Sequence, residues 1–204
     1  MTTTNDFTNS LIDVRKAYRL LFLYQKRVME LVQFMGDTLS FSYQGGWSRF
    51  SSNTPRNSKG SLDNWSWDWL NMYFYEFNFA IKEIDKNKIK FSILLQSDTG
   101  YYDSQSDSKV NVESFLLPEN SETKIIFLVG KNCWHPDFEN DFEDTNAIYK
   151  KELLEYVKTV EEKTLLAKSF LLTDFINLDT TQNALMKWVE FCNENGISQI
   201  EMHK

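Results

Sequence analysis

Large aromatic residues occupy alternate positions in one stretch of the chain, and this pattern constrains the fold more than any other. The rings stand at odd-numbered positions, namely Trp65, Trp67, Trp69, Tyr73, Tyr75, Phe77 and Phe79. In a strand they would share one face of the sheet, with Glu76 and Asn78 on the other, because successive side chains alternate. Aromatic residues also favour strands. We therefore predict a strand from about Leu70 to Ile84, and leave Trp65–Trp69 open between a strand and a helical turn.

A second periodicity, at helical spacing, covers the N-terminal region. Apolar residues recur at intervals of three and four, at Leu11, Val14, Tyr18, Leu21, Val28, Val32 and Met35, with Gln25 as the one polar interruption. This heptad-like stripe predicts a helix that begins near Thr8 and ends at Gly36. Further apolar residues, such as Leu20 and Phe22, widen the stripe, so we expect the helix to pack along a sheet or between neighbours.

The rest of the chain alternates between strand-like and helix-like segments. Asp85–Lys88 is predicted to be a turn that leads into a returning strand at Ile89–Ser97. Further strands are predicted at Val110–Leu117, Lys124–Lys131, Leu165–Ile176 and Ile197–Met202, and helices at Asn146–Glu162 and Thr180–Asn195. An irregular loop is expected around residues 44–64 and an acidic loop around 133–145.

These elements predict an α+β fold. We expect a single antiparallel, meander-like sheet of about five to seven strands, packed by a long N-terminal helix and two C-terminal helices. The chain has 204 residues and shows no internal repeat, which fits one domain over residues 1–204. Its 16 Phe, 9 Tyr and 6 Trp residues predict a core built around large rings.

The charge balance narrows the classes of partner. The net charge is −7, and an acidic chain is repelled by phosphates and anionic lipids, so we expect neither direct nucleic-acid binding nor membrane association. Cys133 and Cys192 are too few for a disulfide scaffold and are expected to be reduced thiols. The polar N-terminal residues lack the pattern of a signal peptide, so the expected location is cytoplasmic.

No motif in the sequence reaches the specificity of a catalytic, metal or nucleotide site. Gly45 and Gly46 lack the context of a phosphate-binding loop. Cys133 and His135 precede a run of acidic residues, but one thiolate and one imidazole are fewer donors than a zinc site uses, and the glycine of a calcium loop is absent. We therefore expect no catalytic residues, no metal and no cofactor, and favour a role that is not enzymatic.

The acidic segment suggests a surface for a protein partner. Trp134, Phe138 and Phe142 recur every four residues among the carboxylates of Asp137, Glu139 and Asp141, while Arg15 and Arg19 lie on the predicted N-terminal helix. Apolar anchors surrounded by charge suit the docking of a basic protein. The function we predict is a non-catalytic interaction module, of the inhibitor or immunity type or an accessory partner in a bacterial or phage system. Alternatively the three rings attach a loop to the core, or the protein forms homo-oligomers through the helix.

A second hypothesis belongs to another class of function. The rings near the first strand could line a site for an aromatic, sugar or cationic ligand, by stacking or cation–π contact. The residues that would form it are Trp47, Arg49, Trp65, Trp67, Trp69 and Tyr73. This hypothesis predicts a small-ligand sensor or an enzyme, and its alternative is that the rings pack in the core.

Overall fold

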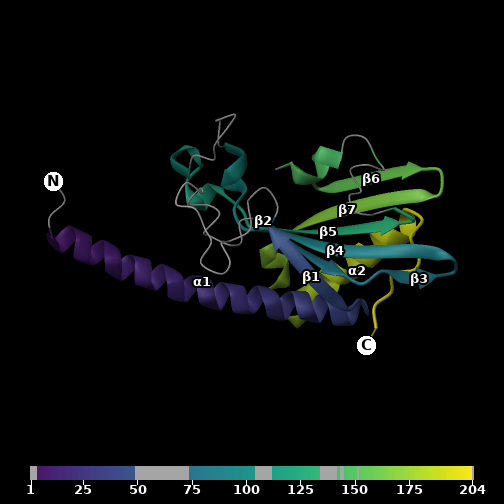
Figure 1. Ribbon diagram of the computed structural model, residues 1–204, viewed down its shortest axis with the longest axis horizontal. Helices are drawn as coiled ribbons and strands as arrows, with labels where there is room; N and C mark the ends of the chain where they lie inside the picture. The colour runs from purple at the N-terminus through teal and green to yellow at the C-terminus, as the bar shows by residue number, and fades with distance from the viewer. Residues whose placement is uncertain are drawn as a thin grey trace, which may run out of the picture. The chain divides into compact units, whose positions relative to one another are not determined.

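The computed structural model describes residues 4–48, 74–103, 112–133, 142, 145–150 and 152–203 (Figure 1). Over these residues the chain forms two α-helices and seven strands. In chain order they are α1 (Thr4–Thr38), β1 (Tyr43–Ser48), β2 (Phe74–Phe79), β3 (Lys82–Ile84), β4 (Asn87–Gln96), β5 (Lys124–Lys131), β6 (Glu155–Val160), β7 (Lys163–Leu171) and α2 (Leu178–Glu194). The chain divides into two compact units, Met1–Met35 and Gly36–Lys204. One domain over residues 1–204 stays a prediction.

All seven strands belong to one antiparallel sheet, which confirms the predicted α+β class. The strand order is β1-β2-β4-β5-β7-β6, and β3 pairs with β4 (Figure 1). The chain forms a meander up to β5. The pattern then changes, because β7 pairs with β5 and leaves β6 at the edge of the sheet. Only one of the two predicted C-terminal helices, α2, is present in the described part of the chain.

One face of the sheet carries an aromatic layer. Phe91 of β4 and Phe127 of β5 are buried on this face, and α2 covers them with the ring of Trp188. The centroid of the Trp188 ring lies 6.3 Å from that of Phe91 and 5.5 Å from that of Phe127. Phe170 and Phe175 extend the layer around Phe127. The abundance of rings in the sequence therefore does predict how this core is built.

The opposite face carries a mixed cluster of aliphatic and aromatic residues. Its members from the strands are Phe74, Leu94, Ile126, Leu128, Leu165 and Ala167, and those outside the strands are Phe142, Ile148, Tyr149 and Leu153. The segment that ends at Leu153 thus buries this face, as α2 buries the other. Both faces are covered, which makes the sheet the central layer of the second unit.

Helix α1 ends beyond the predicted residue. Its last turn is closed by two backbone hydrogen bonds, from the Phe41 N–H to the Gly36 carbonyl at 2.8 Å and from the Ser40 N–H to the Asp37 carbonyl at 3.0 Å. This pair of bonds defines a Schellman motif, whose penultimate residue adopts the left-handed conformation. Ser40 has a φ of 58°. A serine therefore holds the position that usually selects glycine, so the prediction that Gly36 ends the helix is wrong.

A nearby aromatic ring explains why residue 36 is a glycine. A Cβ atom at this position would lie 2.5 Å from Cε1 of Phe79 and 3.0 Å from the carbonyl oxygen of Phe41. We expect Gly36→Ala to lower the free energy of unfolding by about 1–3 kcal/mol through overpacking. In a Phe79→Leu background, the same change should cost less or stabilise, since alanine favours helices by about 1 kcal/mol over glycine. A double-mutant cycle in urea measures this, and equal effects in both backgrounds would contradict the steric explanation.

The predicted helix at Asn146–Glu162 is wrong. The described residues form a short 3-10 turn at Thr145–Tyr149 and then strand β6. A two-residue turn returns the chain to β7, with Val160 opposite Lys163. Val157 and other β-branched residues favour this strand, and pairing with β7 overrides a helical spacing that rests on few apolar residues.

The remaining strand predictions were confirmed only in part. At Val110–Leu117 the described residues form a 3-10 turn, Val112–Ser114, and Ile197–Met202 contains no strand. The predicted strand at Leu70–Ile84 is divided into β2 and β3. By contrast, the bounds of β5 are those predicted from its continuous apolar run.

Candidate functional site

A long apolar stripe runs along α1. We define the α1 stripe as the heptad-spaced residues Leu11, Val14, Tyr18, Leu21, Gln25, Val28, Val32 and Met35. Its last three members are buried, whereas its first four are between 40% and 68% exposed. Large exposed apolar surfaces typically mark binding sites. The first half of the stripe is therefore a candidate contact surface.

The charged residues of α1 add little to this surface. Lys16 pairs with Asp13 at 3.0 Å, and both side chains are well exposed. An exposed pair of this kind contributes only about 0–1 kcal/mol. Arg15 and Arg19, which were predicted to contact a partner, are exposed on the same helix. The structure thus brings the two arginines close to the α1 stripe.

Polar side chains are buried on the sheet face that also carries the mixed cluster. They are Glu76 and Asn78 of β2 and Lys90 and Ser92 of β4, and we call these four residues the polar floor. Asn78 lies directly opposite Ser92 in the strand register, so their Cβ atoms are about 4.5–5.5 Å apart. Glu76, Asn78 and Ser92 are buried, and Lys90 is half-buried. Four polar groups of different chemistry thus meet in a small volume.

Hydrogen bonding within the polar floor is incomplete. The Nδ2 and Oδ1 atoms of Asn78 and the Oγ atom of Ser92 have no hydrogen-bond partner among the described residues. The Lys90 ammonium donates to the carbonyl oxygen of Phe79. Burial lowers the pKa of Lys90, while the nearby Glu76 carboxylate acts in the opposite direction. The floor therefore combines an acid and a base with an amide and a hydroxyl that have bonding capacity left.

Trp47, a residue of the predicted ligand site, lies at the border of the polar floor. It lies on the edge strand β1, opposite Glu76 in the register, so the two side chains share a face of the sheet. The side chain of Trp47 is 43% exposed. An exposed ring beside buried polar groups is a surface on which a flat ligand can stack.

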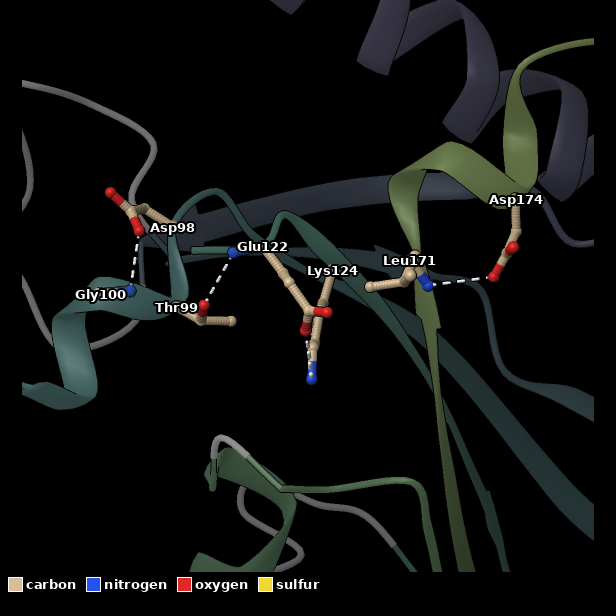
Figure 2. Close-up of polar contacts among 7 residues, drawn as sticks. All are labelled: Asp98, Thr99, Gly100, Glu122, Lys124, Leu171 and Asp174. Atoms are coloured by element: carbon tan, nitrogen blue, oxygen red, sulfur yellow. Dashed lines mark hydrogen bonds and ion pairs between the residues drawn. The ribbon is translucent and has the colours of Figure 1, made fainter. Parts of the chain in front are cut away.

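A second group of polar residues gathers at the end of β4, the start of β5 and the end of β7 (Figure 2). The Asp98 carboxylate accepts a hydrogen bond from the Gly100 N–H at 2.7 Å. The Thr99 hydroxyl accepts one from the Glu122 N–H at 2.9 Å, and the Glu122 carboxylate pairs with Lys124 at 3.2 Å. The Asp98 carboxylate and the Thr99 hydroxyl thus bind backbone N–H groups where the strands end, and the Glu122 carboxylate forms an ion pair with Lys124.

Most residues of the two predicted sites lie outside the described residues. For the partner surface these are Trp134, Asp137, Phe138, Glu139 and Asp141, and for the ligand site Arg49, Trp65, Trp67, Trp69 and Tyr73. The remaining members are Arg15, Arg19 and Trp47, described above, and Phe142. Both sites therefore stay predictions as whole sets.

Phe142 requires a correction. It was predicted to be a surface anchor together with Trp134 and Phe138, but its side chain is only 5% exposed and belongs to the mixed cluster. A ring buried in this way offers no area to a partner. For Phe142 the alternative applies, namely a ring that attaches its segment to the core.

The polar floor was missed as a site at the level of sequence. The alternation in β2 correctly put Glu76 and Asn78 on the face opposite Phe77 and Phe79, but it did not single out Asn78 or Ser92. The available signal was weak. It consists of polar residues at positions where the rest of a strand face is apolar, in the two successive predicted strands Leu70–Ile84 and Ile89–Ser97.

Among the described residues, neither thiol takes part in a disulfide or in a cluster of metal ligands. Cys192 is fully buried, and burial raises the pKa of its thiol. Cys133 donates a hydrogen bond to the Thr164 carbonyl at 3.3 Å, and both cysteines are free. Within the described ranges, no three His, Cys, Asp or Glu residues are grouped so that they could hold a metal ion.

A helix that crosses a lipid bilayer needs a continuous apolar stretch of about 20 residues. Neither α1 nor α2 is long and apolar enough to cross a membrane, as far as the structure describes them.

Comparison with known proteins identifies a family. The PM0109 family model matches residues 4–199, which is nearly the whole chain, so the chain belongs to the PM0109 family. No curated protein and no solved structure matches it.

Proposed function

We propose that this member of the PM0109 family is a non-catalytic protein-interaction module that self-associates through the α1 stripe. The observation that carries the proposal is the exposure of Leu11, Val14, Tyr18 and Leu21 along one line of a 35-residue helix. The occupant of this surface is the same stripe of a second copy of the chain.

The spacing of the stripe favours another helix as its partner. Residues separated alternately by three and four positions form the a and d positions of a heptad repeat, the pattern of two helices that pack along their length. In this register Leu11 and Tyr18 are a residues, and Val14 and Leu21 are d residues. The same line continues to Met35 without a change of phase. A stripe with this spacing suits packing against a helix of the same spacing, such as the α1 stripe of a second copy.

The flanking positions favour a second copy of the chain over a charged partner. Positions e and g border the a and d line and hold Arg15, Phe22 and Met29 at e and Ala17 and Tyr24 at g. Apart from Arg15 these residues are apolar or aromatic, so they widen the contact. The other charges between residues 13 and 30 lie at b, c and f, away from the contact, so only the Arg15 side chains would bring like charges close to it.

Gln25 supplies specificity. It is the single polar residue of the stripe, at an a position and between the exposed and the buried members. One polar residue at an a position fixes the register and the number of helices at some cost in stability. In a parallel pair, the two Gln25 side chains would meet and hydrogen bond. Any shifted register would bury one of them against apolar side chains.

Association would also stabilise α1 itself. Isolated helices shorter than about 15 residues are marginal in water, and most helical stability in proteins comes from the packing of an apolar face. The first half of the stripe lacks such packing because its side chains are exposed. Each Leu or Val that becomes fully buried contributes about 1.5–3 kcal/mol, which favours dimerisation of the helix.

The mass of the full-length protein in solution tests the proposal. For the dimer we expect a Kd on the order of 1 µM. Light scattering should therefore report the mass of a dimer at about 10 µM protein, and the dimer should dissociate on dilution below the Kd. Helicity by circular dichroism should fall as the dimer dissociates, because the free first half of α1 frays. A monomer at all concentrations, with constant helicity, would refute self-association.

Other features of the module stay predictions. A basic protein partner bound by the acidic residues 137–141, and a cytoplasmic location, are supported so far by the sequence and its charge of −7. The acidic residues lie outside α1, whereas Arg15 and Arg19, the basic residues of the same predicted partner surface, lie on it.

A further inference from the structure

The polar floor, Glu76, Asn78, Lys90 and Ser92, contains buried groups with unused hydrogen-bonding capacity. Both atoms of the Asn78 amide and the Ser92 hydroxyl are buried without a partner among the described residues. In native proteins the large majority of buried polar atoms have a partner, and each exception calls for an explanation. Here the exceptions are neighbours, since Asn78 and Ser92 are directly opposite each other in β2 and β4.

Packing alone does not require polar residues at these positions. The same face of the sheet holds Leu94 of β4 and Leu128 of β5, the latter directly opposite Ser92. Leucine in place of Asn78 would continue this apolar surface. A polar residue that weakens the fold at such a position is typical of functional sites, where stability is given up for binding.

We propose that the polar floor binds a small, uncharged ring that presents a hydrogen-bond donor beside an acceptor. The amide of Asn78 offers Nδ2 as a donor and Oδ1 as an acceptor side by side, which is the arrangement that asparagine uses to bind the edge of a purine. The Ser92 hydroxyl can donate or accept opposite it. A nucleobase edge and a pair of neighbouring sugar hydroxyls share this chemistry.

The charges of the polar floor favour a ligand without net charge. The floor holds one carboxylate, on Glu76, and one ammonium, on Lys90, and these influence each other electrostatically. Their charges balance, so a charged ligand would have no counter-ion left in the floor, and burying it unpaired would be costly. The two charged groups can instead strengthen hydrogen bonds to a neutral ligand.

The edge strand β1 provides the side on which such a ligand would lie. Gly45 is opposite Asn78 in the register, and a Cβ atom built on Gly45 would meet no described atom within 4 Å. Trp47, opposite Glu76, has an exposed ring on the same face. A planar base or a pyranose could therefore bond to Asn78 and stack on Trp47, a contact worth about 1–3 kcal/mol for a base.

The first test needs no ligand and uses Asn78→Leu in the full-length protein. If Asn78 serves binding, the unliganded variant should unfold at the wild-type midpoint or up to about 2–4 °C above it, because an unpaired buried amide has been removed. Gln96→Leu is the matched control. The Gln96 amide is also buried without a described partner, and it lies four residues, or about 13 Å, beyond Ser92 along β4. Its replacement should therefore leave the unfolding midpoint in the same range. A large drop in midpoint for Asn78→Leu would assign it a structural hydrogen bond and overturn the proposal.

The second test measures binding of defined probes by calorimetry. Adenosine and cytidine represent the base source, and glucose and galactose the sugar source, each tested to a Kd of about 1 mM. We expect one of the two pairs to bind wild type and Gln96→Leu equally, and Asn78→Leu and Ser92→Ala at least about tenfold more weakly. Binding that survives Asn78→Leu, or no binding of either pair, would overturn the proposal. Neither result depends on self-association through α1, which the mass measurement reports separately.

Discussion

Replacing Trp188 with alanine is expected to lower the free energy of unfolding by about 3–5 kcal/mol. The Trp188 side chain is 0% exposed, and its ring contacts those of Phe91, Phe127 and Phe191 at centroid distances of 6.3, 5.5 and 5.9 Å. Its removal leaves a cavity between α2 and the central strands of the sheet. Native domains are stable by about 5–15 kcal/mol in all, so this one change removes a large part of the total.

Two further variants separate the cavity from other effects. Met186→Ala changes an exposed residue of the same helix, and should stay within about 0.5 kcal/mol of wild type. Trp188→Phe should cost less than Trp188→Ala. It keeps most of the ring and removes an indole N–H that has no hydrogen-bond partner in the described structure. Urea unfolding followed by circular dichroism measures all three. Equal losses for Trp188→Ala and Met186→Ala would contradict the packing of α2 on the sheet.

Long periodic segments could be predicted from the sequence because each one carries many independent signs of the same structure. The stripe from Leu11 to Met35 predicted α1, and the apolar run Lys124–Lys131 predicted β5. The end of α1 could not be predicted. Gly36 looked like a helix end, but it is explained by the ring of Phe79, which is remote in the sequence, and sequence spacing does not reveal such a contact.

The misassigned segment at Glu155–Val160 shows the limit of local periodicity. Few apolar residues define its pattern, and a strand and a helix fit them about equally. The deciding interaction is the ladder with β7, in which Tyr156 lies opposite Ala167 and Lys158 opposite Leu165. The energy that selects the strand therefore comes from pairing, which a reading of one segment at a time does not include.

The polar floor was hidden for a related reason. Alternation alone gives the face of Asn78, but its closeness to Ser92 depends on the register between β2 and β4. A binding site is also indicated by the absence of hydrogen-bond partners for Asn78 and Ser92 among the described residues, which the sequence does not show. By comparison, the stripe on α1 was readable from the sequence, and only the exposure of its first half needed the structure.

The double variant Tyr18→Glu, Leu21→Glu is expected to weaken self-association by at least about a thousandfold. The two residues are neighbouring a and d positions, and both are exposed in the single chain, at 68% and 46%. Each copy would lose about 1.5–3 kcal/mol for each apolar side chain no longer buried, and four carboxylates would approach one another across the contact. Since about 1.4 kcal/mol corresponds to a tenfold change, the expected loss exceeds a thousandfold.

The matched control places the same charges on the other side of the same turn. Leu20→Glu, Leu23→Glu replaces residues at c and f, which are 68% and 61% exposed, and so removes a similar apolar area without touching the a and d line. We expect this variant to remain a dimer in light scattering, whereas the double variant at Tyr18 and Leu21 is a monomer. Glutamate is a good helix former, so both variants should keep α1. If both variants became monomers, the contact would involve the whole circumference of the helix, and a two-helix pair in the proposed register would be excluded.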